Sequence, residues 1–448
     1  MLRMLGPQGS LFELLLPPGM RVLSGELAEI DALLDDPGFF EPFRPFFNPT
    51  DGRPSIPAET YLRLMFLKYR YHLGYERLCI LVTDSITWRR FCRIGLEVCV
   101  PDESTIRKIT VRCGPTLIDG LNARLLTAAH ERGHVNLDRA RADSTVVEAD
   151  IKYPTDSGLL TAATGRMATA MKRLANVGVT VAFTDRTLPA RALQHSIAVW
   201  LRRRNDEAKS EVLAITGQLA SLAELSVAEA TKVLSHKGSS RKVRRMIERL
   251  AILIDRTNMV IGQARCRVNG TQPDGATRLV SLHEPDARPI RKGKLGKPVE
   301  FGYKAQVVDN TDGLILDYSV HIGNPSDTDL LRPAVERIRK HFNAAPILMT
   351  ADRGYWDTTV ETDLHTAGIV TVAIPRTGKP SAARAAIEHA DSFIDAVKWR
   401  TGCEGRISHL KRDWAWRRTR LRSRNGAHVW CGHGVFGHNL VKLVHIQQ

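Results

Sequence analysis

The 448-residue sequence has few cysteines and no long apolar run. Its seven cysteines are odd in number, scattered and never spaced as CxxC, which predicts neither a disulfide framework nor structural zinc and favours a reducing compartment. No stretch approaches the roughly 20 uninterrupted apolar residues that span a bilayer. The start, MLRMLGPQGSLFELLLPPGM, is interrupted by Glu13 and ends in two prolines before Gly19, so we expect neither signal peptide nor anchor. These features together predict a cytoplasmic location and no membrane partner.

Acidic residues are also scarce relative to basic ones. The chain has 48 Asp and Glu against 64 Lys and Arg, a formal net charge of +16. Such an excess favours a polyanionic partner, because lysines and arginines that neutralise phosphates release condensed counterions. The basic residues gather in WLRRRNDEAK near residue 200, SSRKVRRMIERL near 240, RPIRKGKLGK near 290 and KRDWAWRRTRLRSR after Glu404. A basic charge would also suit a protein of the membrane surface, so only the sequence motifs can distinguish a nucleic-acid partner from a membrane.

One carboxylate stands in an otherwise basic segment, WRTGCEGRISHLKR (399–412). Arg400 precedes Glu404 by four positions and Lys411 follows it by seven, so a helix would project all three from one face. A glutamate in a helix is usually a solvated charge. A lone acid within a basic face, however, suits a divalent cation held beside a phosphate backbone.

Two more acids lie in or directly after predicted strands. Asp143 adjoins a β-branched run (145–147) that predicts a strand, and Asp352 follows the apolar run 347–349, which predicts a buried strand. Taken singly, an aspartate at a strand end is commonly a turn residue. The order of the three acids, each in its own block, is therefore more informative than any one of them.

These blocks resemble the DDE-type insertion-sequence transposases of the RNase H-like and retroviral integrase superfamily. In that family the helix with the last catalytic acid carries Tyr, two residues, Arg, three residues, Glu, six residues, Lys. Arg400, Glu404 and Lys411 match this spacing, whereas Val397 stands at the Tyr position. The blocks around the other two acids look like their counterparts as well, including YPTDS at 153–157.

The resemblance implies that Asp143, Asp352 and Glu404 are both the catalytic residues and the metal ligands. Mg²⁺ prefers carboxylate oxygens and keeps several waters, so three acids suffice, and Mn²⁺ is expected to substitute. Two ions roughly 3.5–4 Å apart would serve an in-line displacement at phosphorus, with Asp143 bridging them. The residues expected to contact DNA are Arg400, Lys411, Arg406, Arg412 and Arg353.

The N-terminal stretch, 1–134, reads as mainly helical. Residues 56–78 have apolar positions at helical spacing with Pro57 placed for a first turn, and Asp102 or Ser104 can cap a later helix. Successive short basic helices are compatible with a helix-turn-helix that reads DNA ends. A bundle used for dimerisation or packing remains the alternative.

The remainder predicts an α/β fold: an RNase H-like mixed sheet flanked by helices, with the N-terminal helical domain and a helical insertion. Residues 135–165 would form the first part of the catalytic domain, 166–295 the helical insertion and 296–448 the rest, with a basic C-terminal helix. The second part contains a predicted hairpin that turns near 310–313 and then alternating strands and helices, which favour a partly parallel sheet. In the fold of the resembled family the first and fourth strands are adjacent, which would bring Asp143 to Asp352.

The implied function is metal-dependent cleavage and strand transfer of insertion-sequence DNA ends in a bacterial-type cytoplasm. Its partners would be double-stranded DNA, both the terminal inverted repeats and the target, and a second copy of the chain, because two ends must be joined in a dimer or higher oligomer. Two alternatives stay open. One is an RNase H-like nuclease that cuts without joining, and the other is a catalytically inactive, transposase-derived DNA-binding regulator.

Overall fold

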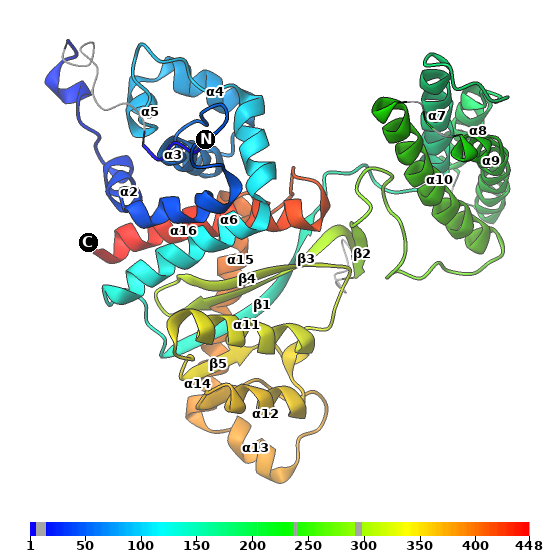
Figure 1. Cartoon of the computed structure of the whole chain (residues 1–448). Helices are drawn as coiled ribbons and strands as arrows, with labels where there is room; N and C mark the ends of the chain where they lie inside the picture. Colours follow the sequence, from blue (N-terminus) through cyan, green and yellow to red (C-terminus); the bar gives the residue numbers. More distant parts are fainter. Residues whose placement is uncertain (6–14, 204, 237, 239, 292–297, 448) are drawn as a thin grey trace. The chain divides into compact units, whose positions relative to one another are not determined.

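The computed structural model describes residues 1–5, 15–203, 205–236, 238, 240–291 and 298–447 (Figure 1). Part of the apolar start (6–14) and part of the basic stretch near 290 (292–297) thus lie outside the described residues. The chain forms two units, which are considered separately. Unit 1 comprises Met1–Glu148, Tyr303–His321 and Pro325–Gln448, and unit 2 comprises Ala149–Gly302 and Ile322–Asn324.

Unit 1 is built on a mixed sheet, so the predicted α/β class is confirmed. Its strands are β1 (Arg139–Glu148), β3 (Val299–Asn310), β4 (Ile315–Ile322), β5 (Leu348–Ala351) and β6 (Thr371–Ala373). They lie in the order β4-β3-β1-β5-β6; β3 and β4 are antiparallel, whereas β5 is parallel to both β1 and β6. The predicted hairpin is present, and its turn uses Gly313 at a φ of 82°, a conformation that glycine adopts without strain. A short strand, β2 (Arg288–Arg291), pairs with the first residues of β3 in unit 2.

Helices lie around this sheet, and those of the N-terminal stretch are among them. Helices α6 and α16 lie side by side, while α11 lies in front of the sheet and α15 behind it in the view of Figure 1. The N-terminal helices therefore belong to the same unit as the sheet. The α-helices of unit 1 are α2 (Glu26–Leu34), α3 (Ala58–Arg70), α4 (Tyr75–Asp84), α5 (Ile86–Phe91), α6 (Glu103–Glu131), α11 (Thr328–Phe342), α12 (Thr358–Thr366), α13 (Ala382–Glu388), α14 (Asp391–Arg400), α15 (Gly402–Asp413) and α16 (Ser423–Gln447). Its 3₁₀ helices are η1 (Pro18–Met20), η2 (Pro37–Phe46) and η4 (Arg353–Tyr355).

Local signals set the ends of the N-terminal helices. Pro57 immediately precedes α3, and the cap of α6 is Asp102, whose carboxylate accepts the Ser104 N–H at 2.7 Å. The apolar run over 56–78, expected to be one helix, breaks instead between α3 and α4, where His72 has a φ of 56°. Helix α6 itself bends at Gly114, which has a φ of 55° and precedes a proline.

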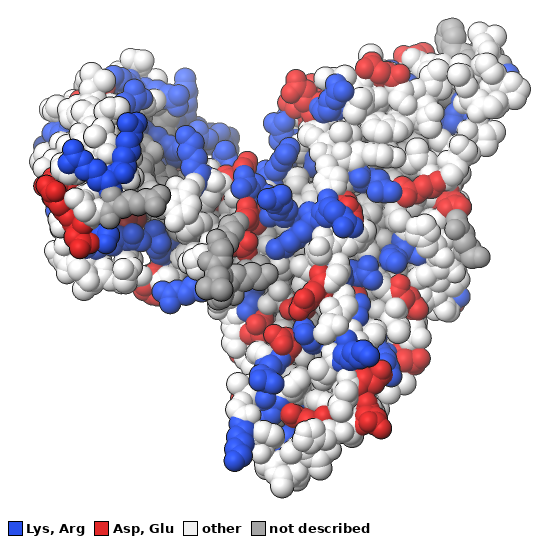
Figure 2. Space-filling model, turned by 180° about the vertical axis from the view of Figure 1, so that it is seen from behind, with Lys and Arg blue, Asp and Glu red and all other residues white. Residues whose placement is uncertain are grey.

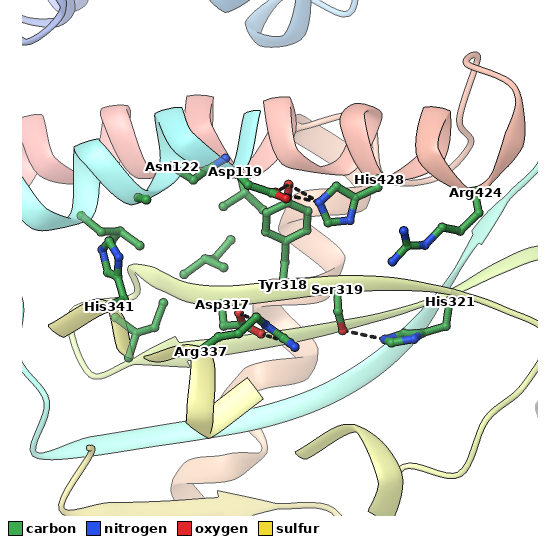
Figure 3. Close-up of a pocket in the computed structure, with 15 residues that line it drawn as sticks. Asp119, Asn122, Asp317, Tyr318, Ser319, His321, Arg337, His341, Arg424 and His428 are labelled. Atoms are coloured by element: carbon green, nitrogen blue, oxygen red, sulfur yellow. Dashed lines mark hydrogen bonds and ion pairs between the residues drawn. The ribbon is translucent and has the colours of Figure 1, made fainter. Parts of the chain in front are cut away.

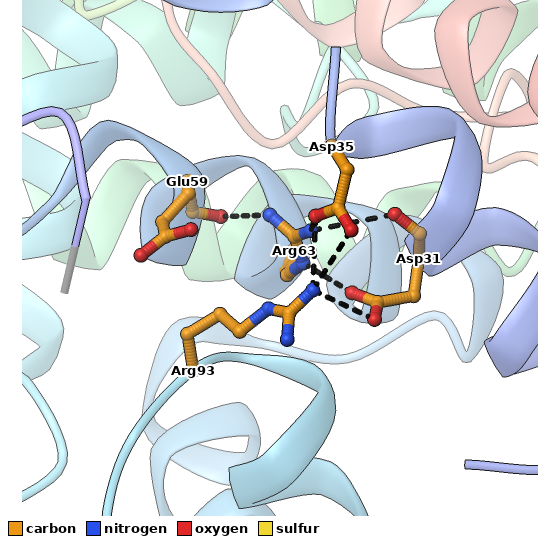
Figure 4. A network of polar contacts seen from close by, with 5 residues as sticks. All are labelled: Asp31, Asp35, Glu59, Arg63 and Arg93. Carbon is orange, nitrogen blue, oxygen red and sulfur yellow. Dashed lines mark hydrogen bonds and ion pairs between the residues drawn. The ribbon is translucent and has the colours of Figure 1, made fainter. Parts of the chain in front are cut away.

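A buried arginine ties three of these helices together (Figure 4). Arg63 on α3 is fully buried, and its guanidinium donates to Asp31 at 2.7 Å and to Asp35 at 2.6 Å, both at or just beyond α2. Arg93, just after α5, reaches the same two carboxylates at 2.9 Å each. Because a buried charge is tolerated only when it is paired, this network fixes how α2, α3 and α5 pack.

The C-terminal helix differs from the expected basic one. Most of α16 is buried, and its histidines 433 and 438 are part of that interior: the His433 ring stacks on Tyr69, and His438 hydrogen-bonds the Gly313 carbonyl. The basic residues expected here lie mainly before the helix, between Lys411 and Arg422. Residues 423–447 form a core helix because their small and apolar side chains allow close packing against α6.

Unit 2 is a helical bundle, and its helices begin earlier than the expected boundary at 166. They are α7 (Asp156–Ala175), α8 (Thr187–Trp200), α9 (Asp206–Thr231), η3 (Lys232–Ser235) and α10 (Arg241–Val268). Among the described residues one segment, Asp206–Ser235, is long and apolar enough to cross a membrane by length and composition. Its Ile215, Leu219 and Ala223 are buried against the other helices of the bundle, as in a core helix.

Candidate active site

The sheet places the first two predicted acids next to each other. Strands β1 and β5 are paired in parallel, with Ala142 opposite Ala351, so the next residues along the chain are Asp143 within β1 and Asp352 directly after β5. Adjacent strands lie about 4.8 Å apart, which brings two carboxylates to one edge of the sheet. Asp143 is half-buried and accepts the N–H of Ser144 at 2.7 Å; Asp352 is exposed and accepts that of Arg353 at 2.8 Å.

Glu404 lies in the first turn of α15, which packs against β1. The Glu404 side chain is 73% exposed, whereas that of Arg400 is 14% exposed; their closest approach is 3.9 Å, from Nη2 to Oε1. The single helix expected for 399–412 is wrong, because α14 ends at Arg400 and α15 begins at Gly402. Thr401 between them keeps helical backbone angles, so the interruption is a local change of hydrogen bonding.

Arg141 supplies the physical reason for that interruption. Its Nη1 donates to the carbonyl of Trp399 at 2.7 Å, and in a continuous helix that carbonyl would accept from residue 403. The Arg141 guanidinium also lies over the Trp399 ring, 4.5 Å from its centroid. Gly402 allows this approach, because a Cβ there would collide with the Arg141 guanidinium.

A buried ion network continues from Arg141. Asp309 on β3, fully buried, accepts from Arg141 at 2.8 and 3.0 Å and from Arg406 of α15 at 3.1 Å. Arg141 and Asp143 point to the same face of β1, since they are two residues apart. The network therefore joins the strand with the first acid to the helix with the third.

The electrostatics around Asp143 show that the charges of the other two acids act on it. Burial raises the pKa of Asp143 to about 6, and the nearby charges of Asp352 and Glu404 add to the rise. The Ser144 N–H and the Arg400 guanidinium lower the pKa of Asp143. Three carboxylates with one nearby arginine form a site that a cation would stabilise.

The three carboxylates are the type of ligand that a divalent metal ion prefers. Hard cations such as Mg²⁺ and Mn²⁺ take carboxylate oxygens, and Asp143, Asp352 and Glu404 supply only those. Within the described part of the chain, no three His, Cys, Asp or Glu side chains stand close enough to hold an ion between them. Of the three carboxylates, that of Glu404 is 73% exposed and approaches Arg400.

The basic residues expected to contact DNA differ in their surroundings. Arg353 and Arg412 are exposed, and Arg412 pairs with its neighbour Asp413 at 2.9 Å. Lys411 is half-buried on α15. Arg406 is 14% exposed and pairs with Asp309, so a DNA contact by Arg406 would require that buried ion pair to open.

Sequence reasoning missed Arg141, Asp309 and Tyr355. Arg141 lies two residues before Asp143 on the same face of the strand, and Asp309 is an acid within a β-branched strand. Both positions could therefore have been noted from the sequence. Tyr355 is 1% exposed, and its pKa is raised chiefly by burial, with contributions from the charges of Asp327 and Asp143. Val397, at the position of the family's tyrosine, packs against an apolar cluster that includes Phe393.

Comparisons with known proteins agree with this geometry. Residues 20–112 match a family model described as a transposase domain (DUF772), and residues 248–440 match one described as a transposase DDE domain. The second range contains Asp352 and Glu404 but not Asp143. An uncharacterized protein, ORF8 in the nfe locus of Rhizobium meliloti, is 30% identical over 128 residues, which are 27% of this chain and 60% of that protein. No solved structure matches.

Proposed function

This chain belongs to the DDE-type insertion-sequence transposases, and we propose that it cleaves the ends of an insertion sequence and joins them to target DNA. The proposed catalytic residues are Asp143, Asp352 and Glu404. The observation that carries this assignment is the β1–β5 register, which places Asp143 and Asp352 side by side although they are far apart in sequence. The coupling of Asp143 to the charges of Asp352 and Glu404 supports the same triad.

We also propose that the sheet is RNase H-like. The order β4-β3-β1-β5-β6, with an antiparallel hairpin on one side of β1 and two parallel strands on the other, supports this interpretation. In such a sheet the carboxyl end of β5 and the middle of the long strand β1 meet at one edge, where a helix can deliver a third acid. The packing of α15, which begins with Glu404 in its first turn, against β1 supports this role for Glu404.

The proposed chemistry needs a divalent cation, which would stabilise charge on the attacking and leaving oxygens of the displacement at phosphorus. The residues of the chain itself would bind the cation and orient the DNA backbone. The three carboxylates would hold the cation, and the first of them, Asp143, must be ionised to do so. Arg400 and Lys411 would hold backbone phosphates, the arginine with a planar fork and the lysine as a point charge.

Two basic surfaces fit the proposed DNA partner. On the described part of α10 in unit 2 the exposed basic residues are Arg241, Lys242, Arg244, Arg245 and Arg249. On the first half of α6 in unit 1, Arg107, Lys108 and Arg112 are exposed around Val111, itself 71% exposed. Figure 2 shows basic side chains spread over the visible face of both units. We propose that the helices of 1–134 and the helical insertion both bind the element's ends, and that two copies of the chain assemble to join two ends.

The test is strand cleavage and joining on labelled DNA that carries the element's flanking inverted repeats, with Mg²⁺ or Mn²⁺. Wild type is compared with Asp143→Ala, Asp352→Ala and Glu404→Ala, and with Asp395→Ala as a control acid that pairs with Arg139 at the surface. We expect end-specific cleavage and joining in the wild type and the control, and loss of both in the three variants while DNA binding persists.

The other outcomes separate the alternatives. Cutting without joining would replace the transposase by a nuclease. Binding without chemistry under either metal would indicate a regulator. Activity that survives one of the three substitutions would remove that acid from the site.

A further inference from the structure

A buried lysine of unit 1 lies in a cage of aromatic rings, apart from the three acids. Lys68 on α3 is 3% exposed. Its ammonium lies 4.3 Å from the ring centroid of Tyr69, 4.8 Å from that of Tyr75 and 4.4 Å from that of Trp430. These rings belong to α3, α4 and α16. The faces of aromatic rings attract a cation but carry no net charge. The cage therefore holds the ammonium in place without neutralising it.

Other buried charges of unit 1 have partners of opposite charge. Arg63 donates to two carboxylates (Figure 4), and Asp309 accepts from two arginines. At the wall of a cavity between β4, α6, α11 and α16, Asp317 accepts from Arg337 at 2.8 and 2.7 Å (Figure 3). Within the described part of the chain, by contrast, no carboxylate pairs with Lys68. Because an uncompensated buried charge is costly, Lys68 indicates a place that an anion would stabilise.

Arg420 supplies a second positive charge next to Lys68. It is exposed and lies in the loop between α15 and α16. Burial, and then the charge of Arg420, lowers the pKa of Lys68 to about 7. The loop is fixed to the end of β1, since the Thr419 N–H donates to the Glu148 carbonyl at 2.9 Å and the Glu148 N–H to the Arg417 carbonyl at 3.2 Å. Among the described residues no acid pairs with Arg420, so the two cations repel each other.

The surroundings of these two cations are basic as well. Arg417 and Arg422 of the same loop are exposed. The Arg107 guanidinium of α6 lies 5.7 Å from the centroid of the Tyr75 ring, which also faces Lys68. Arg107 is itself paired with a glutamate one turn earlier, at 3.0 Å. A surface with this excess of positive charge favours a polyanion.

We propose that Arg420 binds a phosphate of the DNA backbone and that the buried Lys68 stabilises the same phosphate through its charge. A guanidinium can donate two hydrogen bonds to one phosphate, whereas an ammonium acts as a point charge. Since a nearby anion favours the protonated form of Lys68, DNA binding should be accompanied by uptake of a proton above neutral pH. This inference rests on the proposed function, because it assigns part of the DNA interface, and it does not involve the three acids.

Lys68 is the group of this cluster that titrates near neutral pH. The titratable or charged groups around it are Tyr69, Tyr75, Glu103, Arg107, Arg420 and His433. Burial, and then the charge of Lys68, lowers the pKa of His433 to about 3. Burial also raises the pKa of Tyr69 and of Tyr75 above the ordinary 10. Exposed carboxylates and guanidiniums do not titrate between pH 6.5 and 8.5.

Equilibrium binding of a labelled duplex that carries the element's inverted repeat to the full-length protein tests the proposal. Binding is measured at several salt concentrations, at pH 6.5 and at pH 8.5, without divalent metal. We expect the wild-type affinity to fall about fivefold between these pH values, because Lys68 must take up a proton at the higher pH. Lys68→Met, which fills the cage without a charge, should lose this pH dependence.

Arg420→Gln tests the exposed half of the site. We expect about tenfold weaker binding, because a hydrogen-bonded phosphate contact is lost, and a slope of log affinity against log salt that is smaller by about one. The control Arg339→Gln removes an equal charge from an exposed position of α11 and should leave the affinity within about twofold. Thermal melting of each variant separates lost binding from lost folding, and Arg420→Gln tests the site even if Lys68→Met does not fold, because Arg420 is exposed.

The inference and the proposed function fail in different ways. Wild type that binds the duplex, together with an Arg420→Gln variant no weaker than Arg339→Gln, would overturn the inference and leave the proposed function in place. A folded Lys68→Met variant with the pH dependence of wild type would do the same. Wild type that binds no duplex at either pH would overturn both.

Discussion

Replacement of Asp309 by alanine is the sharpest test of how the third acid is positioned. The Asp309 carboxylate is fully buried and accepts three hydrogen bonds from two arginines, Arg141 on β1 and Arg406 on α15. Its removal would leave two guanidiniums, 9% and 14% exposed, without their counter-charge and close to each other. Both effects destabilise the folded chain, since a buried charge loses its hydration and gains a repulsive neighbour.

The expected loss of stability is large. Removal of one partner from a buried ion pair costs about 3–5 kcal/mol, and here one acid serves two arginines, which favours the upper part of that range. Domains are stable by only about 5–15 kcal/mol, so the variant should remain folded with a much smaller margin. At about 2–4 °C per kcal/mol for a domain of this size, the melting temperature should fall by about 6–20 °C.

Thermal melting and urea titration measure this loss, with Asp395→Ala as the matched control. Asp395 on α14 also pairs with an arginine of β1, Arg139, but the two side chains are 59% and 39% exposed. An exposed pair contributes about 0–1 kcal/mol. If Asp309→Ala costs no more than Asp395→Ala, the argument that a buried network docks α15 onto β1 is refuted.

Three further predictions follow from the same site. Asp143→Asn should raise the free energy of unfolding by about 1–3 kcal/mol at pH 7.5, because burial disfavours the ionised carboxylate and raises the pKa of Asp143 from 3.8 to about 6 in the folded state. This gain should decrease as the pH falls through 6 and disappear below about pH 4, which melting temperatures measured against pH would show. Gly402→Ala should destabilise through collision with Arg141, whereas Gly405→Ala on the same helix meets nothing within 4 Å and should stabilise by up to about 1 kcal/mol in urea titration. Arg412→Gln should reduce the salt dependence of DNA binding by about one phosphate contact without a change in melting temperature, whereas Arg406→Gln should lower the melting temperature.

Most of the sheet was predictable because its signals are local. The β-branched run after Asp143, the hairpin with Gly313 and the apolar run before Asp352 each lie within one element, and the structure has strands at all three. The break between α3 and α4 was not predictable from apolar spacing, because the run continues through His72 at helical intervals. Helix α16 was misjudged for a related reason: its basic neighbours precede it in sequence, but its own small residues pack on α6.

The site was predictable as a set of residue types and not as a geometry. Arg400 and Glu404 were identified from motif spacing and the two aspartates from the blocks around them, and their catalytic role stays a prediction. The interruption at Thr401 could not be predicted, because it depends on a hydrogen bond from Arg141, which lies on strand β1, more than two hundred residues earlier. The burial of Arg406 likewise depends on Asp309, which pairing of distant strands brings under α15.

Under the proposed function, the acids differ in what holds them. Asp143 and Asp352 are placed by the hydrogen-bonded ladder of β1 and β5, so their spacing exists before any ligand binds. Glu404 depends on side-chain contacts between α15 and the sheet, and its own carboxylate is 73% exposed. A closer approach of Glu404 would bring a third negative charge toward an Asp143 carboxylate that already resists ionisation, which is unfavourable until a cation binds. Closure of the site and binding of the metal should therefore be a single coupled event, and the start of α15 at Gly402, which the Arg141 side chain of β1 contacts, is the part of the chain whose position determines how readily that event occurs.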